Sequence, residues 1–270
     1  FMYFFFLTAA GLLMIIPLVY SVITSFKPLD ELLAFPPKFY VVRPTFKNYE
    51  ALPELLSNLE VPLSRYVFNT LFVSFGLTFL QVITSALAAF TMCQVKHKLM
   101  NVYYLVIQFA LLYNGTTLAV PQYLIISKMG IIDTFWAYLL PPLAGTMGVF
   151  LIKQFMESSI PHELIEAARI DGAGAGRMFW QIVIPLSKPA LLTWTLFAFQ
   201  GAWATGSGPT IFSESLKTLP SVMTSVVSSG LARSGSAMAV TVVMMIPPIL
   251  MYMITQSNVL ETMGTAGLKD

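Results

Sequence analysis

The sequence predicts an all-α integral membrane protein with six spanning helices. Hydrophobic residues make up 56% of the 270 residues and charged residues only 10%, whereas soluble proteins carry about 25% charged residues. The charged residues also leave six long uncharged runs, and each could hold the roughly 20 apolar residues that a helix needs to cross a hydrocarbon core. These runs are 1–26, 66–95, 99–127, 134–152, 189–213 and 234–260.

Each run predicts one span, and we place both termini in the cytoplasm. The predicted spans are 3–23, 66–94, 100–124, 133–155, 187–207 and 236–258. The first run lacks the basic region and the small-residue cleavage site of a signal peptide, so we interpret it as a true span. A shorter uncharged run at 218–232 is rich in Ser and Thr. We expect it to form a surface segment or a partly buried loop.

The segments between the spans suggest how the chain is organised. Residues 1–65 hold the first span and an extracytoplasmic loop with short helices, and residues 66–270 form a five-helix core with a charged loop at 157–188. Basic residues fall on both sides of the membrane without a decisive bias. Lys96 and Lys98 favour a cytoplasmic location for the turn between the second and third spans.

Catalytic and metal-binding patterns are not found in the sequence. The single Cys93 excludes a disulfide framework and a cysteine-based metal site. His97 and His162 lie in separate loops, and no phosphate-binding G-x-x-x-x-G-K-[ST] motif occurs. Nor do the spans hold the buried charges that proton- or sodium-coupled carriers commonly use. We therefore expect neither an enzyme nor a metal protein.

The loop between the fourth and fifth spans carries the most information. Pro161 suits the first turn of a helix because its missing N–H costs nothing there. Good helix formers follow, and Gly172 stands where a left-handed residue would end the helix. Leu164, Ala167, Ala168 and Asp171 share one side of this helix. A second short helix is expected at 175–184, before Pro185 and Pro189 lead into the fifth span.

This loop resembles the EAA loop of binding-protein-dependent ABC importer permeases. The matching residues are Glu166-Ala167-Ala168, Asp171-Gly172-Ala173, Phe179, Ile182, Ile184-Pro185-Leu186 and Pro189. Further residues are similar to the carbohydrate-uptake branch, which includes the maltose importer: Ser25-Phe26-Lys27-Pro28, Asn48-Tyr49, Trp203, Leu219-Pro220 and the tail Gln256, Gly264 and Gly267-Leu268-Lys269. The tail looks most like the second permease of a heterodimeric pair. Residues 205–208 depart from the family pattern by being smaller and more flexible.

The resemblance implies a set of partners for this chain in a bacterial or archaeal cytoplasmic membrane. A second permease would complete the channel within membrane lipid, and two copies of a cytoplasmic ATPase would bind ATP and magnesium. An extracytoplasmic binding protein would deliver a sugar or oligosaccharide. This chain would hold no cofactor of its own and bind no nucleic acid.

The resemblance also assigns roles within the EAA loop, whose helix would be a coupling helix docked in the ATPase. By this analogy Glu166 offers a charge, Ala167 and Ala168 permit close packing, and Gly172 gives the sharp exit. Asp171 would either join this contact or only cap the turn.

Uncharged polar residues in the spans are candidates for the solute pathway. They are Gln108, Tyr113, Asn114, Gln200 and Trp203. Amides and aromatic rings suit a neutral polyhydroxylated solute, although amides in membrane bundles often only hydrogen-bond between helices. Two alternatives stay open: an ABC permease for a non-sugar solute, and a non-transporting membrane scaffold or secondary carrier.

Overall fold

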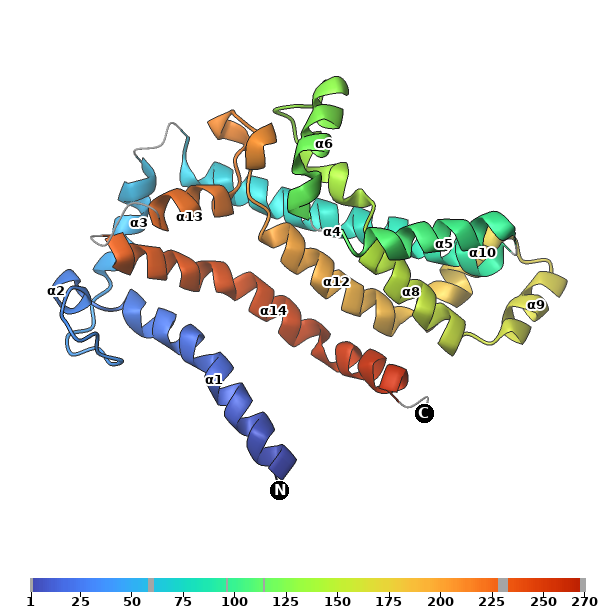
Figure 1. Ribbon diagram of the computed structural model, residues 1–270, viewed down its shortest axis with the longest axis horizontal. Coiled ribbons are helices and arrows are strands. Elements are labelled where there is room, and N and C mark those ends of the chain that lie inside the picture. Colours follow the sequence, from blue (N-terminus) through green and yellow to red (C-terminus); the bar gives the residue numbers. More distant parts are fainter. Residues whose placement is uncertain (1, 58–60, 96, 114, 228–232, 268–270) are drawn as a thin grey trace.

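The computed structural model describes residues 2–57, 61–95, 97–113, 115–227 and 233–267, which form helices and turns (Figure 1). The α-helices are α1 (Met2–Ser25), α2 (Leu29–Leu32), α3 (Lys47–Ser57), α4 (Leu63–Gln94), α5 (Lys98–Ala110), α6 (Gly115–Lys128), α7 (Trp136–Leu139), α8 (Thr146–Ser159), α9 (His162–Ile170), α10 (Ala175–Met178), α11 (Ile184–Leu186), α12 (Lys188–Trp203), α13 (Leu219–Val227) and α14 (Ser234–Gly267). A π-helical turn, Phe179–Val183, joins α10 to α11, and 3₁₀ turns occupy Pro141–Leu143, Gly208–Thr210 and Glu214–Leu216.

The bundle is built around α4, which runs along the length of the molecule beside α12 and α14 (Figure 1). α12 packs between α4 and α14, α8 packs on α4, and α1 packs on α14. α8 and α12 approach closely at Gly148 of α8, where a Cβ atom would stand 2.3 Å from the Trp194 ring of α12. Only glycine fits there, because any larger residue would push the two helices apart.

The bundle has two ends, named after helices α9 and α13. The α9 end contains the C-terminal ends of α4 and α8, the start of α5, and α9 and α10 (Figure 1). The α13 end contains α2, α3, α13 and the segment 204–218 (Figure 1). The turn around Lys98 and the loop 157–188 lie at the same end of the molecule, as the predicted topology requires.

Three of the described helices are long and apolar enough to cross a membrane: Met2–Ser25, Leu63–Gln94 and Ser234–Ser257. Two bent pairs meet the same criterion if each pair is one span. They are Trp136–Leu143 with Thr146–Ser159, bent by 42°, and Ala175–Leu186 with Lys188–Trp203, bent by 81°. The all-helical membrane fold is confirmed, and within the described ranges it has three spans, or five with the bent pairs. The count of six stays a prediction.

The third predicted span, 100–124, is not one continuous helix. α5 ends at Ala110 and α6 begins at Gly115, and α6 turns away from the line of α5 and projects from the bundle (Figure 1). Hydropathy alone did not reveal the break, which coincides with an Asn-Gly dipeptide typical of turns. Asn114 itself lies outside the described residues, as does the tail 268–270.

The prediction of a surface segment or partly buried loop at 218–232 is wrong for residues 219–227, which form a helix. Leu219–Val227 forms α13, and Leu219, Val222 and Met223 are buried in a cluster with Tyr66 of α4 and Val240 of α14. Polar Ser and Thr residues suggested a loop, but the apolar residues between them recur at helical spacing.

Candidate functional site

α9 is held to the bundle by a small part of its surface. It follows Pro161, whose backbone is extended at the N-cap position. Ile165 is only 4% exposed and joins the core made by α4, α8 and α12. Ala168 packs against the same core. Arg169 Nη2 donates to Gln94 Oε1 at the end of α4, at 3.1 Å. The rest of α9 faces away from the molecule.

The predicted coupling residues differ in exposure. Glu166, Ala167, Asp171 and Gly172 are exposed. Ala168 is half-buried against the chain's own core. Ile170, which the sequence did not single out, is 85% exposed on the same helix. Of the alanine pair, only Ala167 has an exposed side chain.

The end of α9 has the geometry that its sequence predicted. Gly172 has φ +79°. Its N–H bonds to Arg169 O at 3.1 Å, and the N–H of Ala173 bonds to Ala168 O at 2.9 Å. These two hydrogen bonds form a Schellman motif, which needs a left-handed residue in the position of Gly172. The left-handed cap is confirmed, and Asp171 occupies the position just before it.

The segment after Gly172 leads into α12 through an irregular helix. In the π-helical turn, the N–H of Ile184 bonds to Phe179 O, five residues earlier. Phe179 and Val183 are buried in the core that also holds Ile165. The helix then bends by 81° into α12. π-helical turns in α-helices often mark functional segments, and this one connects α9 to the centre of the bundle.

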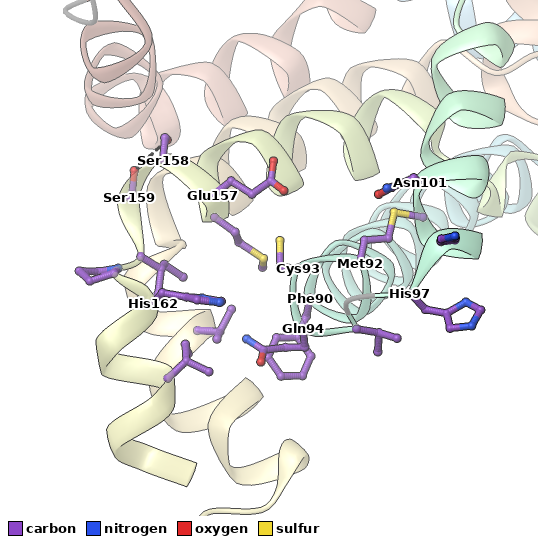
Figure 2. A pocket seen from close by; sticks show the side chains of 17 residues that line it. Phe90, Met92, Cys93, Gln94, His97, Asn101, Glu157, Ser158, Ser159 and His162 are labelled. Carbon is purple, nitrogen blue, oxygen red and sulfur yellow. Dashed lines mark hydrogen bonds between the residues drawn. The ribbon is translucent and has the colours of Figure 1, made fainter. Parts of the chain in front are cut away.

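A cavity of about 770 Å³ lies between the start of α9 and the turn from α4 to α5 (Figure 2). Gln94, Glu157, Ser159 and both histidines line it. Figure 2 shows His162 and His97 on opposite sides of the cavity. No group of three His, Cys, Asp or Glu side chains within the described ranges could hold a metal ion.

Lys153 corrects the expectation that the predicted spans hold no buried charge. It lies in α8, its side chain is largely buried, and its Nζ is 2.6 Å from Glu157 Oε1. The same Nζ lies 4.0 Å from the centre of the Tyr104 ring of α5. The charge is therefore paired inside the protein close to the α9 end.

The structure does not bring the predicted pathway residues to one place. Gln108 is exposed on α5, Tyr113 is 65% exposed just after it, and Gln200 is exposed on α12. Asn114 is outside the described residues. Trp203 is only 7% exposed, and its indole N–H donates to Met244 O of α14 at 3.0 Å. Trp203 therefore makes a contact between α12 and α14 inside the bundle.

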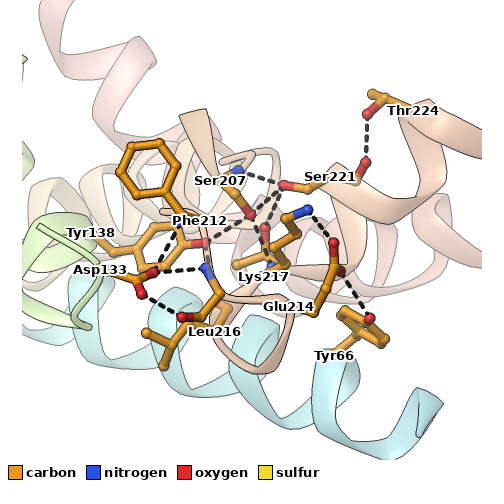
Figure 3. Close-up of polar contacts among 12 residues, drawn as sticks. Tyr66, Asp133, Tyr138, Ser207, Phe212, Glu214, Leu216, Lys217, Ser221 and Thr224 are labelled. Atoms are coloured by element: carbon orange, nitrogen blue, oxygen red, sulfur yellow. Dashed lines mark hydrogen bonds and ion pairs between the residues drawn. The ribbon is translucent and has the colours of Figure 1, made fainter. Parts of the chain in front are cut away.

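Sequence reasoning missed a hydrogen-bond network at the α13 end (Figure 3). Its centre is the buried Ser207 Oγ, which accepts from Tyr138 OH at 2.9 Å and from Ser221 Oγ at 2.6 Å. The N–H of Thr218 also donates to it, at 3.2 Å. The expectation of flexibility around 205–208 is wrong here, because this network fixes the segment. The sequence signal that could have indicated this network is the hydroxyl of Ser207, which stands between Gly206 and Gly208.

Asp133 fixes the same segment from the turn between α6 and α7. Its Oδ1 accepts the N–H groups of Phe212 and Ser213 at 3.0 and 2.9 Å, and its Oδ2 accepts the Ser213 hydroxyl. These bonds favour the charged carboxylate, the Ser213 hydroxyl most of all, and so hold the pKa of Asp133 below its ordinary value. Asp133 has φ +58°, which aspartate tolerates better than most residues.

Two short motifs near the start of the chain form one cluster. Asn48 Nδ2 donates to Ser25 O and Lys27 O, each at 2.8 Å. Tyr49 OH lies 2.8 Å from Ser25 Oγ. A Cβ atom at Gly235 would stand 2.5 Å from the Asn48 side chain, so α14 begins directly against this cluster. The two motifs at 25–28 and 48–49 therefore form one contact region between α1, α3 and α14.

Known proteins are similar to this chain in sequence and in fold. Residues 66–263 match the family described as "Binding-protein-dependent transport system inner membrane component". The sn-glycerol-3-phosphate transport system permease protein UgpE of Yersinia enterocolitica is 30% identical over 205 residues, which cover 74% of this chain and 73% of UgpE. The polygalacturonan/rhamnogalacturonan transport system permease protein YtcP of Bacillus subtilis is 28% identical over 278 residues, covering 94% of this chain and 92% of YtcP.

A solved structure supports the same fold. A chain of a bacterial ABC transporter involved in the import of the acidic polysaccharide alginate superposes with a TM-score of 0.74. The two are 21% identical, and the match covers 93% of each chain. The family match runs from the start of α4 into α14 and so includes α9 and its cap. The protein belongs to the binding-protein-dependent inner membrane components, the permease subunits of ABC importers.

Proposed function

We propose that this chain is one of two different permease subunits of an ATP-driven importer, and that α9 docks in a cytoplasmic ATPase. The observation that carries the proposal is the form of α9. It stands out from the bundle on Ile165, presents Glu166, Ala167 and Ile170, and ends in the fixed turn at Gly172. ATP and magnesium would bind to the ATPase, since this chain has no P-loop sequence.

The connection from α9 to α12 supports a mechanical role for α9. The Schellman turn and the buried Phe179 leave little freedom between α9 and the 81° bend into α12. When two ATPases close around ATP, each coupling helix would be displaced as a rigid piece. The helices above it would then move between outward-open and inward-open arrangements.

The solute we propose is a sugar or oligosaccharide that an extracytoplasmic binding protein delivers. The names of YtcP and of the alginate importer refer to polysaccharides, and Gln108 and Gln200 supply uncharged donors and acceptors. The name of UgpE favours a second candidate, a small phosphorylated solute. A phosphate group would need a free cation in the pathway, whereas Lys153 is paired with Glu157.

The break between α5 and α6 is where we propose that this chain lines the pathway. Backbone groups at a helix break cannot face lipid, because nothing there would satisfy their hydrogen bonds. Gln108 and Tyr113 lie exposed beside this break. Irregular backbone at membrane depth is tolerated where it lines a water-filled cavity or is covered by protein. A pathway shared with the second permease meets both conditions.

Cross-linking to the ATPase tests the docking proposal. We replace Cys93 with Ser and introduce Ile170→Cys, on the exposed face of α9, or Ile165→Cys as the buried control. In membranes containing both permeases and the ATPase, the residue 170 thiol should cross-link to the ATPase and the residue 165 thiol should not. Absence of cross-linking at position 170, with no stimulation of ATP hydrolysis by the loaded binding protein, would support a scaffold instead.

Thiol accessibility tests the pathway proposal. Gln108→Cys and Val106→Cys place thiols on opposite sides of α5, and both native side chains are exposed. A water-soluble reagent should label position 108 alone, and bound solute with its binding protein should slow that labelling. Equal labelling at the two positions contradicts the proposal. Isolation of a transporting homodimer would contradict the pairing with a second, different permease.

A further inference from the structure

The last helix, α14, contains two adjacent prolines, Pro247 and Pro248. A backbone carbonyl in an α-helix accepts a hydrogen bond from the N–H four residues later, and in a 3₁₀ turn from the N–H three residues later. For Met244 these two donors would belong to Pro248 and Pro247. Proline has no N–H, so Met244 O loses both of its helical partners.

Other carbonyls near the proline pair are less affected. Val243 O loses the N–H of residue 247 but keeps that of Ile246, three residues later. Met245 O loses the N–H of residue 248 but keeps that of Ile249, four residues later. Met244 O is thus the one carbonyl in α14 from which the proline pair removes both donors. A carbonyl left without a partner inside a membrane protein costs free energy comparable to a lost hydrogen bond.

A donor from another helix reaches this carbonyl. Trp203, the last residue of α12, is only 7% exposed, and its indole Nε1 lies 3.0 Å from Met244 O. Its ring stacks on Phe199 with the ring centres 5.9 Å apart, and Phe199 meets Phe75 of α4 at 5.5 Å. The indole is therefore held in place by aromatic rings of two helices while its N–H points at α14.

We infer that Trp203 is a positioning residue, whose indole N–H replaces the backbone donor that Pro247 and Pro248 withhold from Met244. The bond connects the C-terminal end of α12 to α14 at Met244. Since α12 follows the segment that begins at α9, this bond is one of the contacts between α12 and α14 through which a displacement of α9 would reach α14. The inference deepens the proposed function, because the transport role of the contact rests on α9 being the coupling helix.

Trp194, also in α12, provides an internal comparison. It is likewise 7% exposed, but its Nε1 has no hydrogen-bond partner within the described part of the chain. Removing the N–H of Trp194 therefore deprives no acceptor, whereas removing that of Trp203 leaves Met244 O unpaired.

A double-mutant cycle tests the replacement of one donor by the other. The variants are Trp203→Phe, Pro248→Ala and the pair together, in the complete complex of both permeases and the ATPase. Trp203→Phe should lower the melting temperature of the complex by roughly 3 °C and solute uptake by about fivefold. Pro248→Ala restores an N–H to Met244 O. In that background Trp203→Phe should change uptake by less than about twofold.

Two controls show whether the rescue is specific. Pro247→Ala returns to Met244 O only the N–H three residues later, whose hydrogen-bond geometry is poorer, and should therefore rescue Trp203→Phe less than Pro248→Ala does. At position 194 the same type of change, benzothienylalanine for tryptophan, should leave the melting temperature unchanged, because the Trp194 N–H has no acceptor in the described part of the chain. Benzothienylalanine at position 203, which keeps the ring shape without the N–H, should reproduce Trp203→Phe and excludes a packing effect of the smaller ring.

The inference is overturned if Trp203→Phe has the same effect in the parent and in the Pro248→Ala background, or if Pro247→Ala rescues equally well. The melting temperatures decide this even in a complex that transports nothing. Failure of the proposed function would instead appear as an absence of ATP-driven uptake in the parent complex.

Discussion

At the α13 end the segment 205–218 is fixed by buried side chains, whereas at the α9 end one helix rests on a small anchor. Asn69 of α4 donates to Ser215 O and Lys217 O at 2.8 and 2.9 Å, and Thr70 accepts the N–H of Leu219. Ile165 and the Arg169–Gln94 hydrogen bond hold α9. At the first end, side-chain donors and acceptors bond to the backbone of the segment, while most of the surface of α9 is exposed.

Under the proposed function, the α13 end acts as the frame and the α9 end as the contact for the ATPase. A helix that exposes Ile170 and Ala167 gains little stability from its own chain, so its free surface suits a docking partner. The hydrogen bonds of the α13 end connect α4 to the segment that follows α12. A displacement of α9 would then be transmitted through the packed helices.

The largest effect is expected from Gly172→Val compared with Gly174→Val. A Cβ atom at either position would meet nothing within 4 Å, but Gly172 has φ +79° and Gly174 has φ −69°. Valine at 172 is therefore strained by about 1–3 kcal/mol for a conformational reason alone, which would tilt or extend α9. We expect normal membrane insertion, with uptake reduced roughly tenfold or more and no stimulation of ATP hydrolysis by the binding protein.

Gly174→Val should transport nearly as the parent does, and Gly172→Asn should lie between the two because asparagine tolerates a left-handed backbone. Uptake and stimulated ATP hydrolysis are measured side by side for the three variants. Parental transport by Gly172→Val would show that the cap of α9 has no part in coupling.

The next effect separates the two sides of α9. Ile165→Ala removes a buried side chain at a cost of about 2–5 kcal/mol, which should detach α9 and lower both the melting temperature and uptake. Ile170→Ala removes an exposed side chain of the same type and should leave the melting temperature of the subunit unchanged. It should instead weaken ATPase binding, measured by retention of the ATPase on the purified permeases.

If Ile170→Ala retains the ATPase as the parent does, the exposed isoleucine does not contribute to docking. If Ile165→Ala leaves the melting temperature unchanged, α9 is held by contacts other than its buried anchor.

A smaller effect is expected at the α13 end from Asn69→Ala. Two carbonyls lose their donor, so the free energy of unfolding should fall by about 2 kcal/mol, while coupling of the remaining folded protein stays intact. Asn101→Ala is the matched control at the α9 end, because Asn101 is exposed on α5. Thermal unfolding compares the two variants. Equal melting temperatures would contradict the conclusion that the α13 end is fixed more strongly than the α9 end.

Local patterns allowed the prediction of features set by local physics. The uncharged runs predicted the bounds of α1 and α4 to within a few residues, and Asp171-Gly172 predicted the left-handed cap. Both features depend on residues that are neighbours in the sequence. The break after Ala110 coincides with a local turn signal that hydropathy alone does not reveal, whereas the bonds of Asn69 could not be predicted from local patterns at all. The latter join residues almost 150 positions apart, and a single sequence contains no signal for such a pairing.

Trp203 shows the same limit at a single residue. The resemblance drew attention to it, and its aromatic ring suggested the solute pathway. The proline pair in α14 was also visible in the sequence. Their connection appears only when the helices are packed, because the carbonyl that needs a donor and the indole that supplies one are 41 residues apart.

The smallest effect is expected from Asp133→Asn, a change that isolates charge from backbone conformation. Asparagine tolerates the left-handed φ of this position as well as aspartate does, so a difference between the two reports the loss of the charged acceptor. The pKa of Asp133 is lowered by its bonds to Ser213 and Phe212. The stabilising charge is therefore present above the ordinary value of 3.8 and is lost as the pH falls below it through the lowered pKa.

A spin label at Phe212→Cys, an exposed position, measures the mobility of the segment that Asp133 holds. With Asp133 present, the label should be immobile at neutral pH and should gain mobility only as the pH falls below the ordinary pKa of an aspartate, because protonation weakens the carboxylate as the acceptor of two backbone N–H groups and one hydroxyl. In the Asp133→Asn variant, mobility should be slightly higher at neutral pH and should not change over the same range. A transition of equal size in both proteins would assign the pH response to another group and leave the fixed character of the α13 end to Asn69 and Ser207.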